Sequence, residues 1–293
     1  MLDQMNKSTT MKKTGPRLPL PVMNTRKKLI LYVSIATGYL ALILIAGIVM
    51  SSELYAVNYE NKFIAPSLAH IFGTDFMGRD MFWRCIKGLS NSILIGVFAA
   101  TVSSIIALGF GMTAAMVGGK VDRLINWCVD CCMGMPHLVL LILISYMMGR
   151  GGTGVAVAVA LTHWPELTRV VRAEVLQVRN AQYVKASFAM GKSGFRVARE
   201  HILPHVLPVY LIGLVLLFPH AIMHEASLTF LGFGFSADTP AIGGILSEAM
   251  KHIVTGKWWL SVYPGLMLLV VVMLFDVIGE KGKMLLNPGS GQL

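Results

Sequence analysis

The sequence predicts an all-α integral membrane protein with about six transmembrane helices. Of its 293 residues, 55% are hydrophobic and only 14% are charged, whereas soluble proteins have about 25% charged residues. The mean hydropathy is +0.66. A helical span needs about 20 apolar residues, so the chain is long enough for about six spans and their loops.

The net charge of +10 is distributed unevenly. Residues 1–28 hold seven Lys and Arg against one Asp, a balance of +6, and residues 163–203 hold seven against three acidic residues, a balance of +4. Basic residues gather in the cytoplasmic loops of membrane proteins, so both segments and both termini are expected in the cytoplasm. No basic stripe is interleaved with stacking aromatic residues, which excludes a nucleic-acid partner.

The chain begins with a polar, basic segment over residues 1–28, expected as a cytoplasmic tail. Residues 29–50 carry no charge and predict the first transmembrane helix. This run exceeds the apolar core of a signal peptide, so it is expected to stay uncleaved. Residues 51–90 are polar and predict an extracytoplasmic segment.

Residues 91–280 predict the core transmembrane domain, and residues 281–293 a second cytoplasmic tail. The expected spans of this core domain are residues 92–117, 133–148, 154–162, 204–226 and 260–278. The run 154–162 is short, but without a crossing there the basic segment 163–203 would lie outside. It is therefore expected to be a helix that runs on into the cytoplasm.

Two spans contain residues that indicate close packing inside a bundle. Gly111 and Ala115 have the spacing that lets helices approach closely in lipid. Pro136, near the start of the third span, frees a backbone group that neighbouring helices must satisfy. The sequence C-x-x-C-C that ends at Cys132 lacks a second pair at zinc spacing. The cysteines are therefore expected to be free thiols.

The most informative segment lies between the fourth and fifth spans. It predicts a short helix over residues 181–190, a break at Gly191, and a basic helix over residues 195–201. Pro204 favours the first turn of the next helix. Two short helices on one face can dock into a groove of a soluble partner, but a basic amphipathic helix can also lie in the lipid interface. From physical chemistry alone, both interpretations stand.

This segment resembles the coupling loop of ATP-binding-cassette (ABC) importer permeases, whose pattern is E-A-A-x3-G-x9-I-x-L-P. Lys185 stands where the pattern has Glu, and His201 where it has Ile, as in variants of the peptide/nickel branch. The resemblance places the coupling loop at residues 173–203. It assigns ATPase coupling to residues of that loop and to the proline directly after it: Tyr183, Lys185, Ala186, Ser187, Gly191, Leu203 and Pro204.

Two further segments are similar to the same branch. The outer segment carries the pattern G-T-D-x-x-G-R-D as Gly73, Thr74, Asp75, Gly78, Arg79 and Asp80. We expect a structural turn in which Arg79 pairs with Asp75 or Asp80; contact with a binding protein is the alternative. The stretches 225–234 and 258–265 resemble the family's C-terminal third, although residues 275–283 lack its usual G-D-x-L-R-D.

The resemblance implies a type I ABC importer permease in the bacterial inner membrane, a second C-type subunit of the peptide/nickel family. It implies no enzymatic activity and no cofactor. No G-x4-G-K-[ST] phosphate-binding motif is present, so ATP hydrolysis is expected on partner subunits. The expected partners are a homologous permease subunit, two ATPases, an extracytoplasmic binding protein and membrane lipid. A secondary transporter or channel working alone is the rival class, and it would not need the coupling loop.

The substrate expected from the resemblance is a short peptide. His220 and His224 are four residues apart on one face of the fifth span, beside Glu225. Ionisable residues at membrane depth are candidates for a substrate path, and paired imidazoles suit nickel. Nickel, free or chelated, is therefore the alternative. The histidines can also serve only to hydrogen-bond neighbouring helices or Glu225.

Overall fold

The computed structural model describes residues 25–286, and most of these residues are helical, as predicted. Within this range the only β-type pairing is an isolated bridge between Thr74 and Asp80. The α-helices are α1 (Thr25–Val49), α2 (Met81–Val117), α3 (Gly119–Gly134), α4 (His137–Met147), α5 (Gly151–Thr162), α6 (Trp164–Arg179), α7 (Gln182–Ala189), α8 (Gly194–Val197), α9 (Leu203–Phe230), α10 (Ile242–Met250) and α11 (Trp259–Leu286). A π-helical turn, η3 (Ala198–Ile202), joins α8 to α9, and short 3-10 turns lie at Ser52–Tyr55, Tyr59–Asn61 and Ile253–Thr255.

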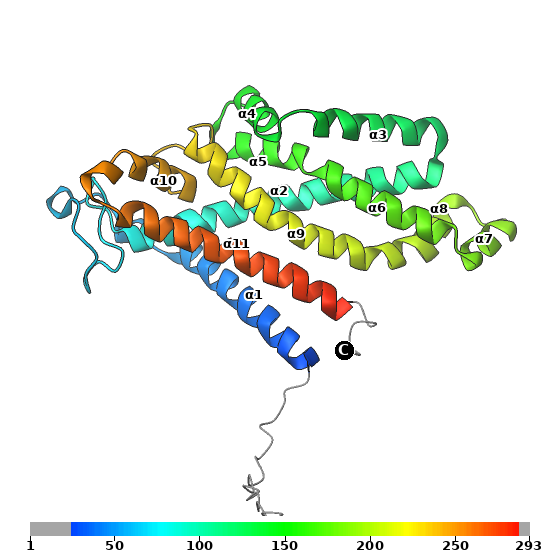
Figure 1. Cartoon of the computed structure of the whole chain (residues 1–293), viewed down its shortest axis with the longest axis horizontal. Coiled ribbons are helices and arrows are strands. Elements are labelled where there is room, and N and C mark those ends of the chain that lie inside the picture. Colours follow the sequence, from blue (N-terminus) through cyan, green and yellow to red (C-terminus); the bar gives the residue numbers. More distant parts are fainter. Residues whose placement is uncertain (1–24, 287–293) are drawn as a thin grey trace, which may run out of the picture.

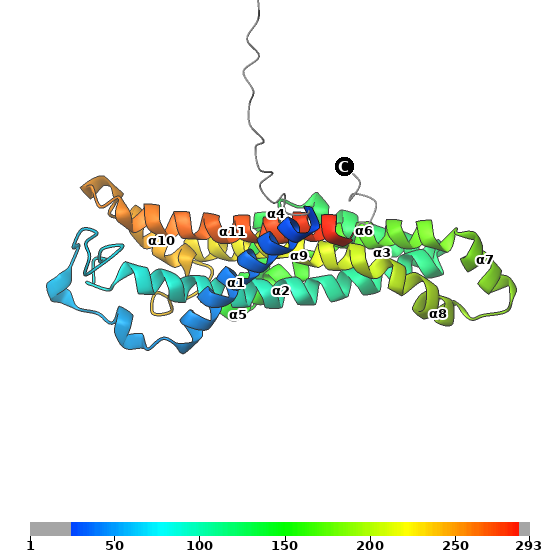
Figure 2. The same cartoon turned by 90° about the horizontal axis from the view of Figure 1, so that it is seen from below.

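The long helices form an elongated, flattened bundle (Figures 1 and 2). Helices α7 and α8 lie at one end of its long axis (Figure 1). Residues 51–80 and helix α10 lie at the opposite end (Figure 1). The two motif-bearing segments of the sequence are therefore far apart.

Two hydrophobic cores share helices α2 and α9. One core joins them to α5, α6 and the beginning of α7, with Val159, Val171 and Val184 fully buried. The other joins them to α1, α10 and α11 around Leu89 and Ile242. Because both cores include α2 and α9, these two helices form the centre of the bundle.

Small residues allow the closest helix contacts. A β-carbon on Gly96 of α2 would lie 2.5 Å from Ile222 of α9, and one on Gly111 would lie 2.7 Å from Val171 of α6. The close approach predicted at Gly111 is therefore used, and its partner is α6.

Four helices in residues 25–286 are long and apolar enough to cross a membrane: Arg26–Val49, Met81–Val117, Gly194–Phe230 and Trp259–Leu285. A fifth span results if α3 and α4 are counted together, although they meet at a bend of 96°. The third expected span is thus divided at Pro136, where the proline removes an intrahelical hydrogen bond and favours a bend. The fourth is divided at His163, where α5 gives way to α6.

Both chain ends are only partly described. Residues 1–24 of the expected N-terminal tail and residues 287–293 of the C-terminal tail lie outside the described part. Helix α1 begins at Thr25, four residues before the expected span, and α11 continues to Leu286.

Candidate functional site

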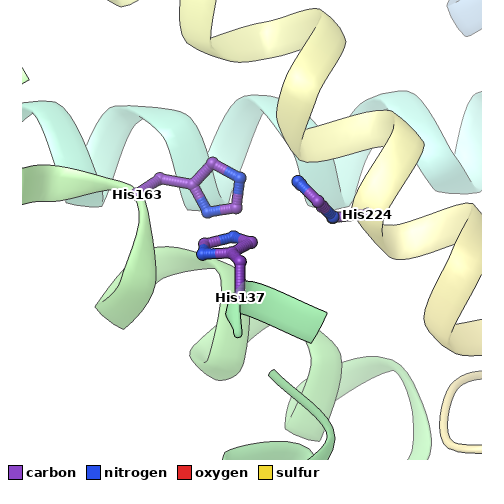
Figure 3. A group of neighbouring side chains, drawn as sticks. All are labelled: His137, His163 and His224. Atoms are coloured by element: carbon purple, nitrogen blue, oxygen red, sulfur yellow. The ribbon is translucent and has the colours of Figure 1, made fainter. Parts of the chain in front are cut away.

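Three histidines from three separate segments converge within the bundle (Figure 3). His137 begins α4, directly after the bend at Pro136. His163 occupies the break between α5 and α6, and His224 lies on α9. One nitrogen from each ring lies within 4.8 Å of the other two. Such a group of neutral imidazoles is a set of nitrogen ligands for a metal ion.

The proton position on His163 follows from its hydrogen bond. Its Nδ1 atom lies 2.9 Å from the backbone carbonyl oxygen of Val159. A carbonyl oxygen can only accept, so Nδ1 carries the proton and Nε2 keeps a free lone pair. Nε2 of His163 and Nε2 of His137 are both buried without a hydrogen-bond partner among the described residues. Both nitrogens are therefore available to a ligand.

A cavity of about 300 Å³ adjoins the three rings. It is also lined by His220, by Cys132 with its neighbour Met133, and by Glu166. His220 and His224 share this cavity, as their spacing on one helical face predicted. Glu225 does not line it: its side chain is fully buried and its Oε1 accepts a hydrogen bond of 2.8 Å from the Thr229 hydroxyl.

The sequence-based reasoning missed His137 and His163. The available signal was that each histidine stands at a helix break inside the membrane domain, where a side chain can project sideways into the bundle. The thiols are free as expected: all four cysteines are unpaired, and Cys132 faces the cavity.

The predicted coupling segment forms a knob, which we define as residues 181–202. Helix α7 ends at Ala189, and Gly191 then adopts a φ of +82° that reverses the chain. Helix α8 follows, with Ser193 accepting a hydrogen bond from the Arg196 amide. Pro204 lies in the first turn of α9, as predicted, and no break precedes it in the chain. The π-helical turn Ala198–Ile202 carries it directly into α9.

His201, the departure from the family pattern, contacts another pattern residue. Its Nε2 lies 3.0 Å from the hydroxyl of Ser187, which is itself buried. The Ser187 hydroxyl also donates to the carbonyl oxygen of Tyr183 at 3.0 Å. Because Ser187 donates to Tyr183, the imidazole donates to Ser187. This bond ties α7 to the π turn.

The tip of the knob exposes large apolar side chains together with Lys185. Phe195 is 81% exposed and Met190 is 72% exposed, and Tyr183 and Phe188 are also exposed. Lys185, Ala186 and Gly191 share this exposure. Leu203 is half-buried and Pro204 exposed at the start of α9. The pattern residues therefore divide into an outward set on α7 and an inner set, Ser187 with His201, that holds the knob together.

The outer motif forms a buried network of charges. Asp75 accepts hydrogen bonds from Arg79 Nε at 2.7 Å and from Arg84 NH1 at 2.9 Å. Both guanidinium groups also contact Glu248 of α10. Of the two pairings the sequence left open for Arg79, the structure has Asp75. Asp80 instead caps α2 and pairs with His70 at 2.8 Å.

The geometry of this turn depends on glycine and threonine. Gly73 and Gly78 have φ values of +71° and +75°, and a β-carbon on Gly78 would lie 1.7 Å from the Asn58 carbonyl oxygen. Only glycine fits there. The Thr74 hydroxyl donates to the Asn61 carbonyl and accepts from the Ile64 amide. The motif thus holds the outer loop against α2, α10 and α11.

The chain is similar to known membrane transport proteins. Residues 92–280 match the family described as "Binding-protein-dependent transport system inner membrane component". The chain is 33% identical over 225 residues to the dipeptide transport system permease protein DppC of Bacillus subtilis strain 168, covering 77% of this chain and 70% of that protein. It is 30% identical over 263 residues to the nickel transport system permease protein NikC of Escherichia coli K12, covering 87% of this chain and 94% of that protein.

A solved structure of the MetNI methionine ABC transporter, described as inward-facing, has the same fold. The TM-score is 0.60 at 17% identity, over 71% of this chain and 98% of that chain. Permeases of this family are non-catalytic, and ATP is hydrolysed by a separate subunit. The family works with ATPase and substrate-binding partners. The chain belongs to the binding-protein-dependent inner membrane component family and is a multi-pass permease subunit of an ABC importer in the bacterial inner membrane.

Proposed function

We propose that this chain pairs with a homologous permease subunit, that the pair associates with two ATPases, one of which docks on the knob, and that the pair forms the translocation path for a substrate delivered by an extracytoplasmic binding protein. In this arrangement both termini and the knob face the cytoplasm, and residues 51–80 with α10 face outward. The opposite positions of these segments in Figure 1 and the excess of basic residues in 163–203 support this orientation.

The observation that carries the coupling function is the exposed tip of the knob. Tyr183, Phe188, Met190 and Phe195 offer apolar and aromatic surface beside Lys185. Aromatic and methionine side chains are enriched where protein interfaces form. A groove on an ATPase would bury this tip, and closure of the ATPases would move α7. Each nucleotide state must then bind one permease conformation better than the other.

The test is to replace Gly191 by valine in the assembled transporter. The φ of +82° costs a β-branched residue about 1–2 kcal/mol or more, whereas the space around a β-carbon there is open. The change therefore alters the direction of the chain without a packing clash. Gly194→Val is the matched control, because its surroundings are equally open and its φ is not in the positive range.

We expect Gly191→Val to abolish substrate uptake and the stimulation of ATP hydrolysis that accompanies uptake. The membrane subunits should still assemble. Gly194→Val should retain most of both activities. Charge reversal by Lys185→Glu, at an exposed position, should give the same loss as Gly191→Val. Full uptake and ATPase association in both Gly191→Val and Lys185→Glu would refute the assignment of this loop to coupling.

Two substrate classes are supported. The names of relatives such as the dipeptide permease support short peptides, and the name of the nickel permease relative supports nickel, free or chelated. Nickel is also favoured by the imidazole group that borders the cavity. Parallel uptake of labelled dipeptide and radioactive nickel in cells with and without this chain tests the two classes.

A further inference from the structure

Three imidazoles from three separate helical segments lie side by side within the bundle. His137 and His163 stand at the two helix breaks, and His224 reaches them from α9 (Figure 3). The ring centroids lie 4.6 to 5.1 Å apart in all three pairs. Histidines that served only to link helices would direct their nitrogens at hydrogen-bond acceptors. Here two buried Nε2 atoms meet no partner among the described residues.

Buried nitrogen atoms with free lone pairs are costly unless something binds them. On His163 the lone pair is fixed at Nε2, because Nδ1 donates to Val159. This arrangement, with the second nitrogen held by a backbone carbonyl, is typical of histidines that bind metals. A metal ion at the centre of the group would satisfy the unpartnered nitrogens together.

The dimensions suit an ion of the first transition series. Metal–nitrogen bonds of about 2.0–2.1 Å put ligand nitrogens about 3–4 Å apart. The nitrogens of the group are within 4.8 Å of one another, so modest rotation of the rings closes the site. Imidazole ligands suit nickel, copper, zinc and iron, whereas magnesium and calcium require oxygen ligands. Three imidazoles leave the other coordination positions open to the cavity.

The cavity fits a metal better than a peptide. A dipeptide carries a carboxylate and an ammonium group, and burial of a charge without a partner is costly. Glu166 can meet the ammonium group, but none of the described residues lining the cavity is Lys or Arg. The remaining lining includes Cys132 and Met133, whose sulfur atoms are soft metal ligands.

We propose that His137, His163 and His224 bind one divalent transition metal ion of the nickel class as transported substrate. This inference rests on the proposed function, since it treats the cavity as part of the translocation path. It specifies the substrate class and the ligands, and it assigns His220 a place beside the site and not in it.

The test measures metal binding in the complete transporter, co-expressed with its permease partner and ATPases. The probes are Ni²⁺ alone and Mg²⁺ alone, measured by equilibrium dialysis against the wild type, His163→Ala and the control His205→Ala. His205 lies on the same helix α9 as His224, exposed and 3.8 Å from Glu174. Loss of a supporting group costs about 10–100-fold in metal affinity, so loss of a ligand should cost at least tenfold.

We expect the wild type and His205→Ala to bind Ni²⁺ alike, His163→Ala to bind at least tenfold more weakly, and none to bind Mg²⁺. Nickel X-ray absorption of the wild type adds a readout that needs no variant, and it should show imidazole scattering from several rings. Equal nickel affinity in His163→Ala and wild type, or absorption without imidazole scattering, would overturn the site. ATPase coupling through the knob is measured in the same samples, so failure of the metal site is distinguished from failure of the proposed coupling function.

Discussion

The Nδ1 atom of His163 and the carbonyl oxygen of Val159 lie 2.9 Å apart, one helical turn from each other at the end of α5. This bond fixes the ring proton on Nδ1 and leaves the lone pair of Nε2 without a hydrogen-bond partner among the described residues. The break between α5 and α6 is thus the reason that the imidazole can act as a ligand. In a continuous helix, the backbone of His163 would join the helical hydrogen bonds, and its side chain would point in another direction.

His224 and His220 should differ in their effect on metal binding, although they share a helical face. His224 belongs to the group whose nitrogens lie within 4.8 Å, whereas His220 only lines the cavity. We expect His224→Ala to lower Ni²⁺ affinity at least tenfold and His220→Ala to lower it much less. Equilibrium dialysis of the two variants measures the difference. Equal losses would show that the ligand set is wrong.

Asp75 should be essential to the order of the outer segment. Its carboxylate is 3% exposed and receives both Arg79 and Arg84. Asp75→Asn leaves two buried guanidinium groups short of a countercharge, which costs about 3–5 kcal/mol. Hydrogen exchange of the amides of residues 58–80 should speed up by about two to four orders of magnitude, the equivalent of that energy.

Glu53→Gln provides the control for Asp75→Asn, because Glu53 is an exposed carboxylate of the same outer segment. It should leave the exchange rates unchanged. Unchanged protection in Asp75→Asn would mean that the network around Arg79 and Arg84 does not hold the outer loop.

The bond between Ser187 and His201 predicts a measurable coupling within the knob. His201→Ile introduces the residue that the family pattern has, but removes the donor to a buried hydroxyl at 3.0 Å. A typical hydrogen bond contributes about 0.5–1.5 kcal/mol. A double-mutant cycle with Ser187→Ala, read by hydrogen exchange over residues 182–202, should give a coupling energy in that range. Additive effects of the two changes would contradict the contact.

Much of the fold was predictable because it depends on long apolar runs and their charged flanks. Helices α1, α2, α9 and α11 correspond to charge-free or nearly charge-free stretches, and Gly111 indicated a close helix contact. The bend between α3 and α4 was less accessible. Pro136 indicated a disturbance, but the angle depends on packing against α5 and α9. The π-helical turn before Leu203 was likewise not predicted, because it results from the continuous path of the chain from α8 into α9.

Of the three histidines in the group, only His224 was predicted from the sequence. His220 and His224 are linked by helical periodicity, which sequence spacing reveals. His137 and His163 come from breaks far away in the chain, and their meeting with His224 is a tertiary event. In the outer motif, similarly, the sequence indicated that Arg79 pairs with a nearby Asp, whereas Glu248 reaches the same cluster only because α10 packs there.

Uptake in living cells tests the central claim most directly. Radioactive nickel and labelled dipeptide are measured side by side in cells that carry the wild-type chain, His163→Ala or no chain. The account predicts that nickel uptake requires the chain and is lost in His163→Ala, with ATPase coupling intact and dipeptide uptake the same in all three. Loss of dipeptide uptake without the chain, with nickel uptake unaffected by either change, would contradict it.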